Sequence, residues 1–369
     1  MLLDIIAGAR PNFMKISPII AAIRKAASDG HDVSYRLIHT GQHYDKNMSD
    51  QFFEQLGIPL PDINLGVGSG TQAEQTAAIM IGYEKVIMER RPDLTIVVGD
   101  VTSTMACAIS AKKLHVKVAH VEAGIRSGDI TMPEEVNRLV TDSITDYFFT
   151  TSSYANENLE RAGVQQERIF FVGNTMIDTL MANLDRLRKP AFWDQYGMES
   201  GKYLVMTLHR PSNVDDKDNL LSIIQTVMEL AGEHKIVFPV HPRTRKNLDQ
   251  TGFSDKRLIL TEPMGYLEFI YMVKNAKAVI TDSGGITEEA TVLGIPCMTM
   301  RNSTERPETC VVGTNELIGT DPKALIPAIE KLMSGNWKKG TIPEMWDGKA
   351  AERIINAFVT TLKPEPVYD

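Results

Sequence analysis

The sequence is poor in cysteine, in long apolar runs and in excess positive charge, and each shortage excludes a class of protein. Three cysteines among 369 residues, Cys107, Cys297 and Cys310, provide neither a disulfide framework nor a metal-ligand spacing, which predicts a reducing compartment. No apolar run approaches the about 20 residues that cross a membrane, and no basic head or cleavage site precedes the first apolar stretch, Leu2–Ala7. The net charge of -8 argues against nucleic acid as the main partner. We therefore predict a cytoplasmic protein whose anionic ligands are held by local positive groups.

What the chain does contain is an alternation of strand-length apolar stretches and helical patterns, on both sides of a polar hinge between residues 173 and 202. Strands such as Leu2–Ala7 are almost continuously apolar, as parallel strands buried on both faces are. This order predicts an α/β protein with two Rossmann-like, doubly wound parallel-sheet domains facing each other across a cleft. We place the first domain at residues 1–172 with a C-terminal helix at 349–369, and the second at 173–348. Such sheets bind ligands at the carboxyl ends of their strands.

A glycine turn in the second half has the form of a diphosphate site. Ser283–Gly285 lies between a predicted strand and a predicted helix, Thr287–Leu293. Glycine permits backbone angles that let N–H groups converge on an anion, and the helix N-terminus adds a partial positive charge. Glu288 and Glu289 lie in the first turn of the predicted helix. Either they simply favour the helix dipole, or one of them accepts a hydrogen bond from a ribose hydroxyl beside the diphosphate.

Cations and polar side chains follow the first two predicted strands. Arg10 and Lys15 come after Leu2–Ala7, where they either face a diphosphate or are simply solvated. Gln42 and His43 follow the second strand, where His43 is either structural or a binding residue. Their place at the strand ends makes all four candidates for contacting an anionic ligand.

Three carboxylates are expected at one edge of the first sheet. Asp100 ends one buried strand and Glu122 ends the next, while Glu134 lies in the first turn of a helix that begins at Pro133. Clustered carboxylates without histidine ligands suit proton transfer, because repulsion and burial raise a carboxyl pKa towards neutrality. A Mg²⁺ site would also fit these acids, and Asp100 could simply cap a turn. The predicted apolar face of the helix consists of Val136, Leu139, Val140, Ile144 and Tyr147.

Two histidines end strands of the second half in the same way. His209 follows the predicted strand Tyr203–Leu208, and His241 follows the next strand. Histidine suits proton transfer or a phosphate contact near neutral pH, so we expect at least one of the two to be functional. Phe269, in a predicted helix, fits the core on composition alone. The residues thus predict a nucleotide-linked substrate, with acid/base chemistry on the attached group.

The chain resembles, nearly from end to end, the non-hydrolysing UDP-N-acetylglucosamine 2-epimerases. The resemblance rests on the motifs GARPNFMK, TGQHYD, VVGD, HVEAGIRSGD, PEEVNR, VGNTMIDT, TLHRPSNVD, VHPRT, TDSGGITEEATVLG and TERPE. It implies the glycosyltransferase-B fold and reversible inversion at C2 of UDP-N-acetylglucosamine (UDP-GlcNAc), giving UDP-N-acetylmannosamine (UDP-ManNAc). In the family the enzyme removes the C2 proton and expels UDP, which adds back to a 2-acetamidoglucal after protonation of the opposite face. The resemblance implies a homodimer and a role in polysaccharide biosynthesis, and neither a metal nor another cofactor.

The resemblance also implies roles for individual residues. The catalytic set would be Asp100, Glu122, Glu134 and His209, of which Asp100 and Glu134 would move protons, Glu122 would tune them and His209 would steady the departing phosphate. The contacts to UDP would be Arg10, Lys15, Phe269, Ser283, Gly284, Gly285, Glu289 and Arg306, with Glu289 on the ribose. A second UDP-GlcNAc, bound as an activator, would contact Gln42, His43, Gln75, Arg210 and His241.

The sequence departs from the family pattern at a few positions. Glu74 stands where activated relatives often carry Arg, and its charge would repel an activator's diphosphate. The short stretch Asp129–Glu134, together with Pro211 and Ser212, leaves open an epimerase of a related UDP-2-acetamido sugar. A hydrolysing epimerase that releases ManNAc and UDP, a glycosyltransferase of the same fold and a non-catalytic nucleotide-sugar sensor also stay open.

Overall fold

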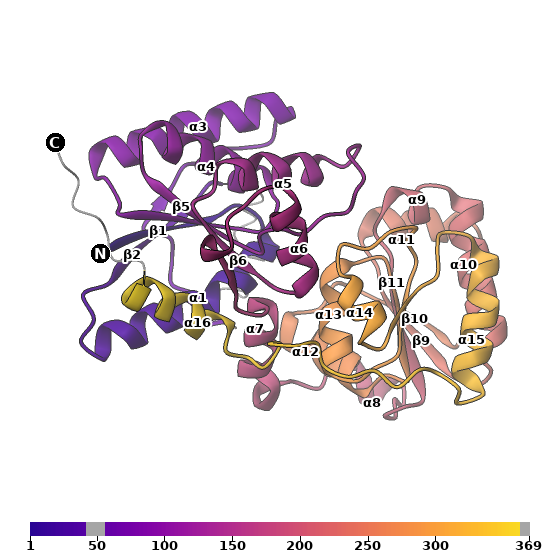
Figure 1. Ribbon diagram of the computed structural model, residues 1–369. Coiled ribbons are helices and arrows are strands. Elements are labelled where there is room, and N and C mark those ends of the chain that lie inside the picture. Colours follow the sequence, from indigo (N-terminus) through magenta and orange to yellow (C-terminus); the bar gives the residue numbers. More distant parts are fainter. Residues whose placement is uncertain (42–55, 362–369) are drawn as a thin grey trace. The chain divides into compact units, whose positions relative to one another are not determined.

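A computed structural model of the chain describes residues 1–41 and 56–361, which form two compact units (Figure 1). The first unit consists of Met1–Ala182 and the segment that begins at Glu344, and the second of Asn183–Pro343. The sequence predicted these divisions at residues 172 and 349. Within the described ranges, no helix is long and apolar enough to cross a membrane.

The first unit is built on a parallel sheet, with seven described strands in the order β3-β2-β1-β4-β5-β6-β7. The strands are β1 (Leu2–Ala7), β2 (Ser34–His39), β3 (Ile63–Asn64), β4 (Leu94–Val98), β5 (Lys117–Val121), β6 (Tyr147–Thr150) and β7 (Ile169–Phe171). Every residue of β4 is buried, as a parallel strand covered on both faces requires. The winding direction reverses between β1 and β4, and doubly wound sheets bind their ligands beside the carboxyl ends of such a strand pair.

Helices cover both faces of this sheet. The main ones are α1 (Arg10–Ser28), α3 (Gln72–Glu89), α4 (Thr102–Lys113), α5 (Pro133–Ile144), α6 (Ser153–Arg161), α7 (Thr175–Asn183) and α16 (Ala350–Asn356), which continues as a π-helical turn, Ala357–Thr361. Figure 1 shows α3, α4 and α5 on one face and α1 with α16 on the other. The Asp178 carboxylate accepts N–H bonds from Ala350 and Ala351, at 3.0 and 2.7 Å, and so fixes the start of α16 on the first unit.

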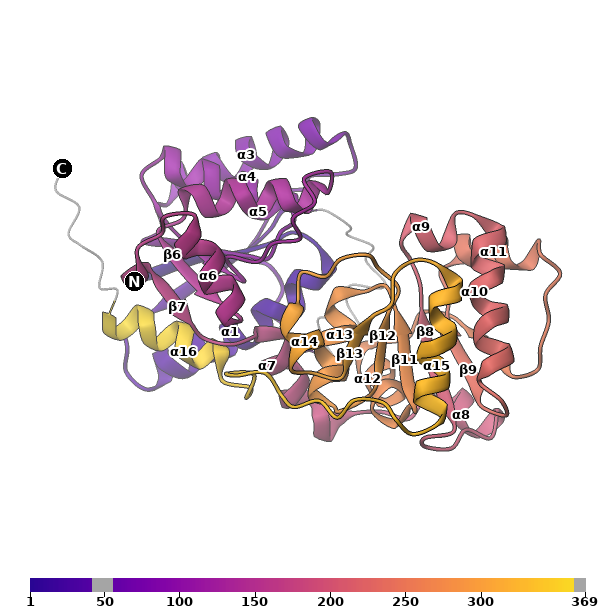
Figure 2. The same ribbon diagram turned by 45° about the vertical axis from the view of Figure 1, so that its right-hand side comes forward.

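The second unit has the same plan, with described strands in the order β10-β9-β8-β11-β12-β13, all parallel. The strands are β8 (Tyr203–Thr207), β9 (Lys235–Pro239), β10 (Leu258–Thr261), β11 (Ala278–Thr281), β12 (Cys297–Thr299) and β13 (Asn315–Leu317). The helices are α8 (Phe192–Gln195), α9 (Pro211–Val214), α10 (Lys217–Leu230), α11 (Pro242–Asp249), α12 (Tyr266–Asn275), α13 (Gly284–Val292), α14 (Pro307–Val311) and α15 (Leu325–Met333). Figure 2 shows α10 and α15 packed together on one face. The reversal point here lies between β8 and β11.

The predicted fold class is confirmed: the chain is an α/β protein with two doubly wound parallel sheets. Both reversal points carry residues that the sequence singled out. Asp100 follows β4 in the first unit, and His209 follows β8 in the second. The fold therefore presents candidate functional side chains where parallel sheets bind ligands.

Candidate active site

Glu122 is held in a strained conformation at the end of β5. Its φ angle is 69°, in the left-handed region that a side chain makes costly by about 1–3 kcal/mol. The side chain is only 4% exposed, and its Oε2 atom lies 2.6 Å from Nζ of Lys15 on α1. Strain of this kind persists where the surrounding structure demands one orientation. Helix α1 and the end of β5 therefore meet through an ion pair between two residues predicted to serve different roles, Lys15 as a UDP contact and Glu122 in catalysis.

Asn12 is a residue at this edge that the sequence analysis missed. Its Oδ1 accepts the N–H of Ala9 at 2.9 Å, and its Nδ2 donates to the carbonyl of Val98, at the end of β4, at 2.8 Å. The side chain is 2% exposed. Asn12 therefore ties the loop after β1 to the end of β4, directly before the Gly99–Asp100 turn. The only sequence signal was its place in the GARPNFMK motif.

The prediction for the buried face of α5 is wrong. Val136 and Leu139, expected in the core, are 39% and 41% exposed. The buried positions of α5 are polar instead: Glu135, Asn137, Arg138, Thr141 and Asp142. Polar side chains can be buried at low cost when each finds a partner, and here the partners are the loops that follow the strands. Hydrophobic periodicity therefore indicated the wrong face for Val136 and Leu139, whereas Ile144 packs against a core cluster as predicted.

Arg138 links α5 to Asp100. Its Nη2 donates to Asp100 Oδ2, and its Nη1 donates to Glu135 Oε2 at 2.8 Å. Nδ2 of the neighbouring Asn137 donates to the backbone carbonyl of Asp100 at 2.8 Å. A guanidinium at this position stabilises the ionised form of Asp100, the form that can accept a proton. Arg138 belongs to the PEEVNR motif, but the sequence alone did not indicate its contact with Asp100.

Glu135 anchors this arrangement on its other side. Its carboxylate accepts the backbone N–H of Ser127 at 2.9 Å and that of Gly128 at 3.2 Å. Burial alone would raise the pKa of Glu135, but the Ser127 N–H bond and the Arg138 guanidinium outweigh it and hold the pKa below its usual range. Glu135 is therefore an ionised carboxylate that orients Arg138.

Glu134, the third predicted acid, is placed differently from the other two. Its side chain is exposed, and it makes no hydrogen bond or ion pair with any other residue of ranges 1–41 and 56–361. It lies in the first turn of α5, one turn before Asn137 and Arg138, which both contact Asp100. The structure thus brings the start of α5 to the Asp100 edge of the sheet. It leaves Glu134 available to a ligand, whereas Asp100 and Glu122 are paired.

In the second unit, Asp282 organises the loop after β8. It is fully buried directly after β11, and its carboxylate accepts the N–H groups of His209 and Arg210 at 3.0 and 2.9 Å. Its Oδ2 atom also accepts a hydrogen bond from Nδ2 of Asn213 at 2.9 Å, and its Oδ1 atom lies 2.6 Å from Nδ1 of His209. Burial raises the pKa of Asp282, but its bonds to His209 and Asn213 outweigh this and lower the pKa overall. The pairing at Nδ1 leaves Nε2 of His209, a largely exposed side chain, for a ligand.

The predicted glycine turn is wrong in detail. Helix α13 begins at Gly284, so Gly284 and Gly285 form its first turn rather than a loop with unusual backbone angles. Neither has a positive φ. The first-turn N–H groups of a helix still lack acceptors within it, so an anion site at Ser283–Gly285 remains compatible with this geometry. The helix starts earlier than predicted because two consecutive glycines do not by themselves break a first turn.

Glu288 and Glu289 are buried rather than exposed at the helix N-terminus. They are 1% and 3% exposed, and neither lies in the first turn of α13, so the dipole interpretation is wrong. Nε of Arg306 donates to Oε1 of Glu288. Burial raises the pKa of Glu289 to about 8, and the neighbouring charge of Glu288 adds to this despite a contact with Tyr266. Near neutral pH, Glu289 therefore retains a proton and can donate as well as accept a hydrogen bond.

We expect Glu289 to make the second unit less stable as the pH rises. Its pKa is about 8 in the folded chain against 4.5 as a model group, so the folded form binds the proton more tightly. The contribution of Glu289 to stability is then greatest below about pH 4.5 and falls as the pH rises to about 8, by up to about 1.4 kcal/mol per pH unit. Glu289→Gln, which stays neutral, should show a smaller fall than the native chain between about pH 5 and about pH 8 in urea unfolding.

The matched control is Glu262→Gln, because the Glu262 side chain is 76% exposed. This variant should keep the pH dependence of the native chain. If the free energy of unfolding fell equally steeply with pH in the native chain and in Glu289→Gln, the raised pKa of Glu289 would be contradicted. Burial raises the pKa of Glu308 to about 7, so Glu308 acts in the same direction and remains unchanged in both variants.

The remaining predicted site residues are distributed over both units. Arg10 is the first residue of α1, and Phe269 on α12 packs against the core cluster of the second unit. Gln42 and His43 lie outside the described residues. Gln75 lies on α3 of the first unit, whereas Arg210 and His241 follow β8 and β9 of the second. These contacts to UDP and to an activator stay predictions.

The structure explains why Glu74 stands beside Gln75. Glu74 Oε2 accepts the backbone N–H of Thr71 at 2.9 Å, while the Thr71 hydroxyl accepts the N–H of Glu74 at 3.3 Å. This reciprocal pair is a capping box at the start of α3. The carboxylate is therefore engaged in capping the helix.

Comparison with known proteins relates this arrangement to one family. A family model described as UDP-N-acetylglucosamine 2-epimerase matches residues 25–359. The chain is 43% identical over 368 residues to the UDP-N-acetylglucosamine 2-epimerase of Methanocaldococcus jannaschii, covering 96% of this chain and 98% of the relative. It is 40% identical over 318 residues to the UDP-2,3-diacetamido-2,3-dideoxy-D-glucuronate 2-epimerase of Pseudomonas aeruginosa, covering 85% and 87%.

Solved structures agree with this relationship. The crystal structure of the M. jannaschii UDP-GlcNAc 2-epimerase in complex with UDP-GlcNAc and UDP is 42% identical in sequence, with a TM-score of 0.85. The alignment covers 97% of this chain and 99% of that one. The similarity therefore extends over both units.

Proposed function

Because the chain belongs to the UDP-N-acetylglucosamine 2-epimerase family, we propose that it interconverts UDP-GlcNAc and UDP-ManNAc by inversion at C2. The observation that carries the proposal is the near full-length similarity to a UDP-GlcNAc 2-epimerase, at 43% identity. The geometry agrees with it, because each unit presents a different part of the required chemistry. At its sheet edge the first unit has two carboxylates, Asp100 and Glu122, each paired with a cation. The second unit has His209 beside the start of α13.

The reaction begins with removal of the C2 proton by a carboxylate. The electrons of the C2–H bond form the C1–C2 double bond, and the bond from C1 to the diphosphate oxygen breaks with its electron pair leaving on UDP. The resulting 2-acetamidoglucal is protonated at C2 from the opposite face while UDP adds back to C1. Asp100 and Glu134 serve as the proton carriers, since Arg138 favours the ionised form of Asp100 and Glu134 is exposed.

The other predicted residues bind or steady the charged parts of the substrate. Glu122, strained and paired with Lys15, tunes the carboxylates. His209, fixed through Nδ1 by Asp282, steadies the departing phosphate with Nε2. The proposed contacts to UDP are Arg10, Lys15, Phe269, Ser283, Gly284, Gly285, Glu289 and Arg306, with Glu289 on the ribose. UDP must stay bound between its elimination and its addition back to C1, so that the same nucleotide completes the inversion.

A product assay tests this proposal. UDP-GlcNAc is incubated with the chain, without an acceptor, and products are identified by ¹H and ³¹P NMR. We expect a stable mixture of UDP-GlcNAc and UDP-ManNAc. Free ManNAc accumulating one-for-one with UDP would instead assign a hydrolysing epimerase, and an unchanged substrate would favour a sensor or an acceptor-dependent transferase.

A related sugar is the second candidate substrate. The P. aeruginosa relative, named for a 2,3-diacetamido glucuronate sugar, is 40% identical over 318 residues, close to the 43% of the UDP-GlcNAc relative. The two sugar nucleotides share the 2-acetamido group and the diphosphate, so the same acids would serve both. A comparison of kcat/KM for the two sugar nucleotides decides between them.

We also propose that a second UDP-GlcNAc can act as an activator through Gln42, His43, Gln75, Arg210 and His241. The M. jannaschii structure holds UDP-GlcNAc together with UDP, which supports binding of two nucleotides in this family. Activation would appear as a sigmoidal dependence of the rate on UDP-GlcNAc concentration. It would become hyperbolic in Gln75→Ala.

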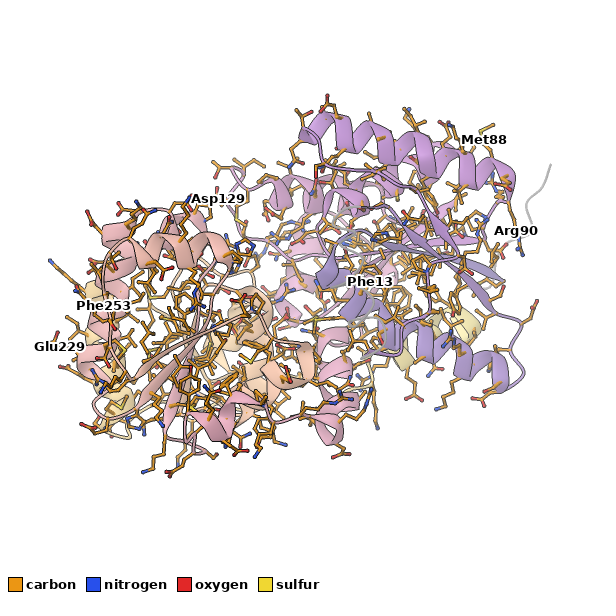
Figure 3. All side chains as sticks on the ribbon, turned by 180° about the vertical axis from the view of Figure 1, so that it is seen from behind. Phe13, Met88, Arg90, Asp129, Glu229 and Phe253 are labelled. Carbon is orange, nitrogen blue, oxygen red and sulfur yellow. The ribbon has the colours of Figure 1, made fainter. Side chains whose placement is uncertain are left out.

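We further propose a homodimer that forms through the outer faces of α3 and α5. A groove of about 540 Å³ runs between these helices, lined by Ala73, Ala77 and Met80 of α3, Met105 of α4, and Pro133 and Val136 of α5. Large apolar side chains beside it are exposed, among them Ile81 at 54% and Leu139 at 41%. Met88, at 74%, extends the same face towards the end of α3 (Figure 3). A second copy with the same face could cover this surface in a symmetric contact.

Leu139→Glu is expected to shift this dimer towards monomers in sedimentation velocity, because it places a charge in an apolar contact. Val311→Glu is the matched control, since Val311 is an equally apolar side chain, 68% exposed, on α14 of the second unit. It should leave the oligomeric state unchanged. If Leu139→Glu sediments as the native chain does, the proposed contact face is wrong.

A further inference from the structure

His120 lies at the centre of the first sheet and has a hydrogen-bond partner for each ring nitrogen. It belongs to β5 and is completely buried. Nδ1 lies 2.7 Å from Oδ1 of Asp142 on α5, and Nε2 lies 2.8 Å from the backbone carbonyl of Gly99. The imidazole therefore spans from α5 to the turn that carries Asp100.

Hydrogen-bond accounting fixes the protons on this ring. A carbonyl oxygen can only accept, so Nε2 must carry a proton to bond Gly99. Oδ2 of Asp142 accepts the N–H of Gly124 at 3.1 Å and lies 2.6 Å from Nη1 of Arg126, which keeps the carboxylate ionised. An ionised carboxylate can only accept as well, so Nδ1 also carries a proton. Two ring protons make the imidazole a cation.

The charged surroundings agree with a buried imidazolium. In the part of the chain that the structure describes, the ionisable groups that face the ring are Asp142 and, through the Asp142 carboxylate, Arg126. The residues beside it on the neighbouring strands, Val97 and Phe148, are apolar. Burial raises the pKa of Asp142, yet His120 and Arg126 outweigh this and hold the pKa below its usual range. Two cations and one anion thus leave a net positive charge beneath the carboxylate edge.

This cluster holds the backbone on both sides of the predicted acids. Gly99, which receives the Nε2 bond, directly precedes Asp100 and has a φ of 70°. Gly124, whose N–H binds Asp142, lies two residues after Glu122 and has a φ of 76°. Both turns need a left-handed backbone that the local sequence alone would not fix. The cluster therefore ties the loops after β4 and β5 to α5, the helix that also carries Arg138 and Glu134.

We propose that His120 is a positioning residue with a proton on both ring nitrogens, which with Asp142 holds the turns of Asp100 and Glu122 in the geometry required for proton transfer at C2. The protonation of His120 stands on its hydrogen bonds alone. Its role in the reaction rests on the proposed function. Neither His120 nor Asp142 would touch the substrate, and both act through the backbone of Gly99 and Gly124.

Kinetics of Asp142→Asn test the positioning role. The amide keeps the shape of the side chain but removes the charge that stabilises the imidazolium. We expect kcat for epimerisation to fall by about 10- to 100-fold, because small misplacements of catalytic groups have effects of this size. KM and the affinity for UDP should change by less than about twofold, since the affected groups position the proton carriers. His120→Gln, which keeps one donor, should retain more activity than His120→Ala.

The matched control is Asp146→Asn. Asp146 lies just after the end of α5, whereas Asp142 lies just before it. The Asp146 carboxylate binds Nζ of Lys112 at 2.8 Å and accepts the N–H of Val118 near the start of β5. This variant should keep the native kcat. An unchanged kcat in Asp142→Asn, or a loss of UDP affinity equal to the loss of kcat, would overturn the positioning role.

Selective ¹⁵N-histidine NMR of the native chain tests the protonation directly. The His120 ring, identified by the signals lost in His120→Gln or shifted in Asp142→Asn, should show a proton on each nitrogen at neutral pH, because each nitrogen faces an acceptor, the Asp142 carboxylate or the Gly99 carbonyl. In Asp142→Asn one of the two should disappear. A single ring proton in the native chain would overturn the inference, and Asp142→Asn identifies the ring if His120→Gln fails to fold. A native chain that does not epimerise at all would refute the proposed function and leave the NMR result standing.

Discussion

Asp100→Asn is expected to lower kcat for epimerisation by about 10²- to 10⁴-fold, because the amide cannot accept the C2 proton. The substitution preserves the size of the side chain and its place beside Arg138 and Asn137. The affinity for UDP should stay close to the native value, because the proposed contacts to the nucleotide remain. Initial rates at saturating UDP-GlcNAc, with UDP binding measured by calorimetry, check both parts.

The control for this variant is Asp29→Asn. Asp29 is an exposed residue at the C-terminal end of α1, and its replacement should leave kcat unchanged. If Asp100→Asn kept more than about half of the native kcat, proton transfer by Asp100 would be ruled out. A parallel loss of UDP affinity would mean that Asp100 supports binding rather than chemistry.

Asp282→Ala is expected to destabilise the second unit by about 3–5 kcal/mol and to abolish activity. The substitution leaves the N–H groups of His209 and Arg210 without an acceptor, and it leaves Nδ2 of Asn213 with only the carbonyl of Met300. Removing one partner of a buried charge network leaves the others desolvated and unpaired. Urea unfolding measures the loss of stability. Asp282→Asn, which keeps some of these bonds, should fold better and still lose activity through the changed orientation of His209.

Asp255→Ala provides the comparison, because the Asp255 carboxylate is paired with Arg257 near the surface of the same unit. Surface ion pairs contribute about 0–1 kcal/mol, so this variant should unfold almost as the native chain does. Equal unfolding of the Asp282 and Asp255 variants would show that Asp282 does not hold the loop after β8 together.

The sequence predicted the sheets well because parallel strands leave a strong local signal. β1 and β4 are short apolar runs bounded by glycine or polar residues, and β11 was predicted with its observed bounds, Ala278–Thr281. Burial on both faces demands such runs, whatever the rest of the chain does. The alternation with helices then left few topologies other than two doubly wound sheets.

Helix α5 shows where that reasoning fails. Its apolar positions Val136 and Leu139 point outward, and its buried positions are polar. A periodicity argument assumes that apolar side chains face the core, but this helix faces loops whose N–H and carboxylate groups need partners. Such partners are distant in sequence: Arg138 and Asp100 are separated by 38 residues. Local patterns carry no information about pairings of that kind.

The sequence predicted which site residues follow the strands, but it did not predict which side chains hold them in place. Asp100, Glu122 and His209 were singled out because each follows a buried strand, which topology alone places at the ligand edge. The groups that hold them, among them Arg138, Asp282 and His120, looked like ordinary charged residues. Their roles depend on burial and on distances between loops, which only the folded chain defines.

The most direct test of the account is turnover of UDP-GlcNAc in D₂O without an acceptor, followed by NMR. The account predicts that deuterium from the solvent appears at C2 of both UDP-GlcNAc and UDP-ManNAc, and at no other carbon of the sugar. UDP-ManNAc that retains the original hydrogen at C2 would contradict it, because no carboxylate could then have exchanged that proton.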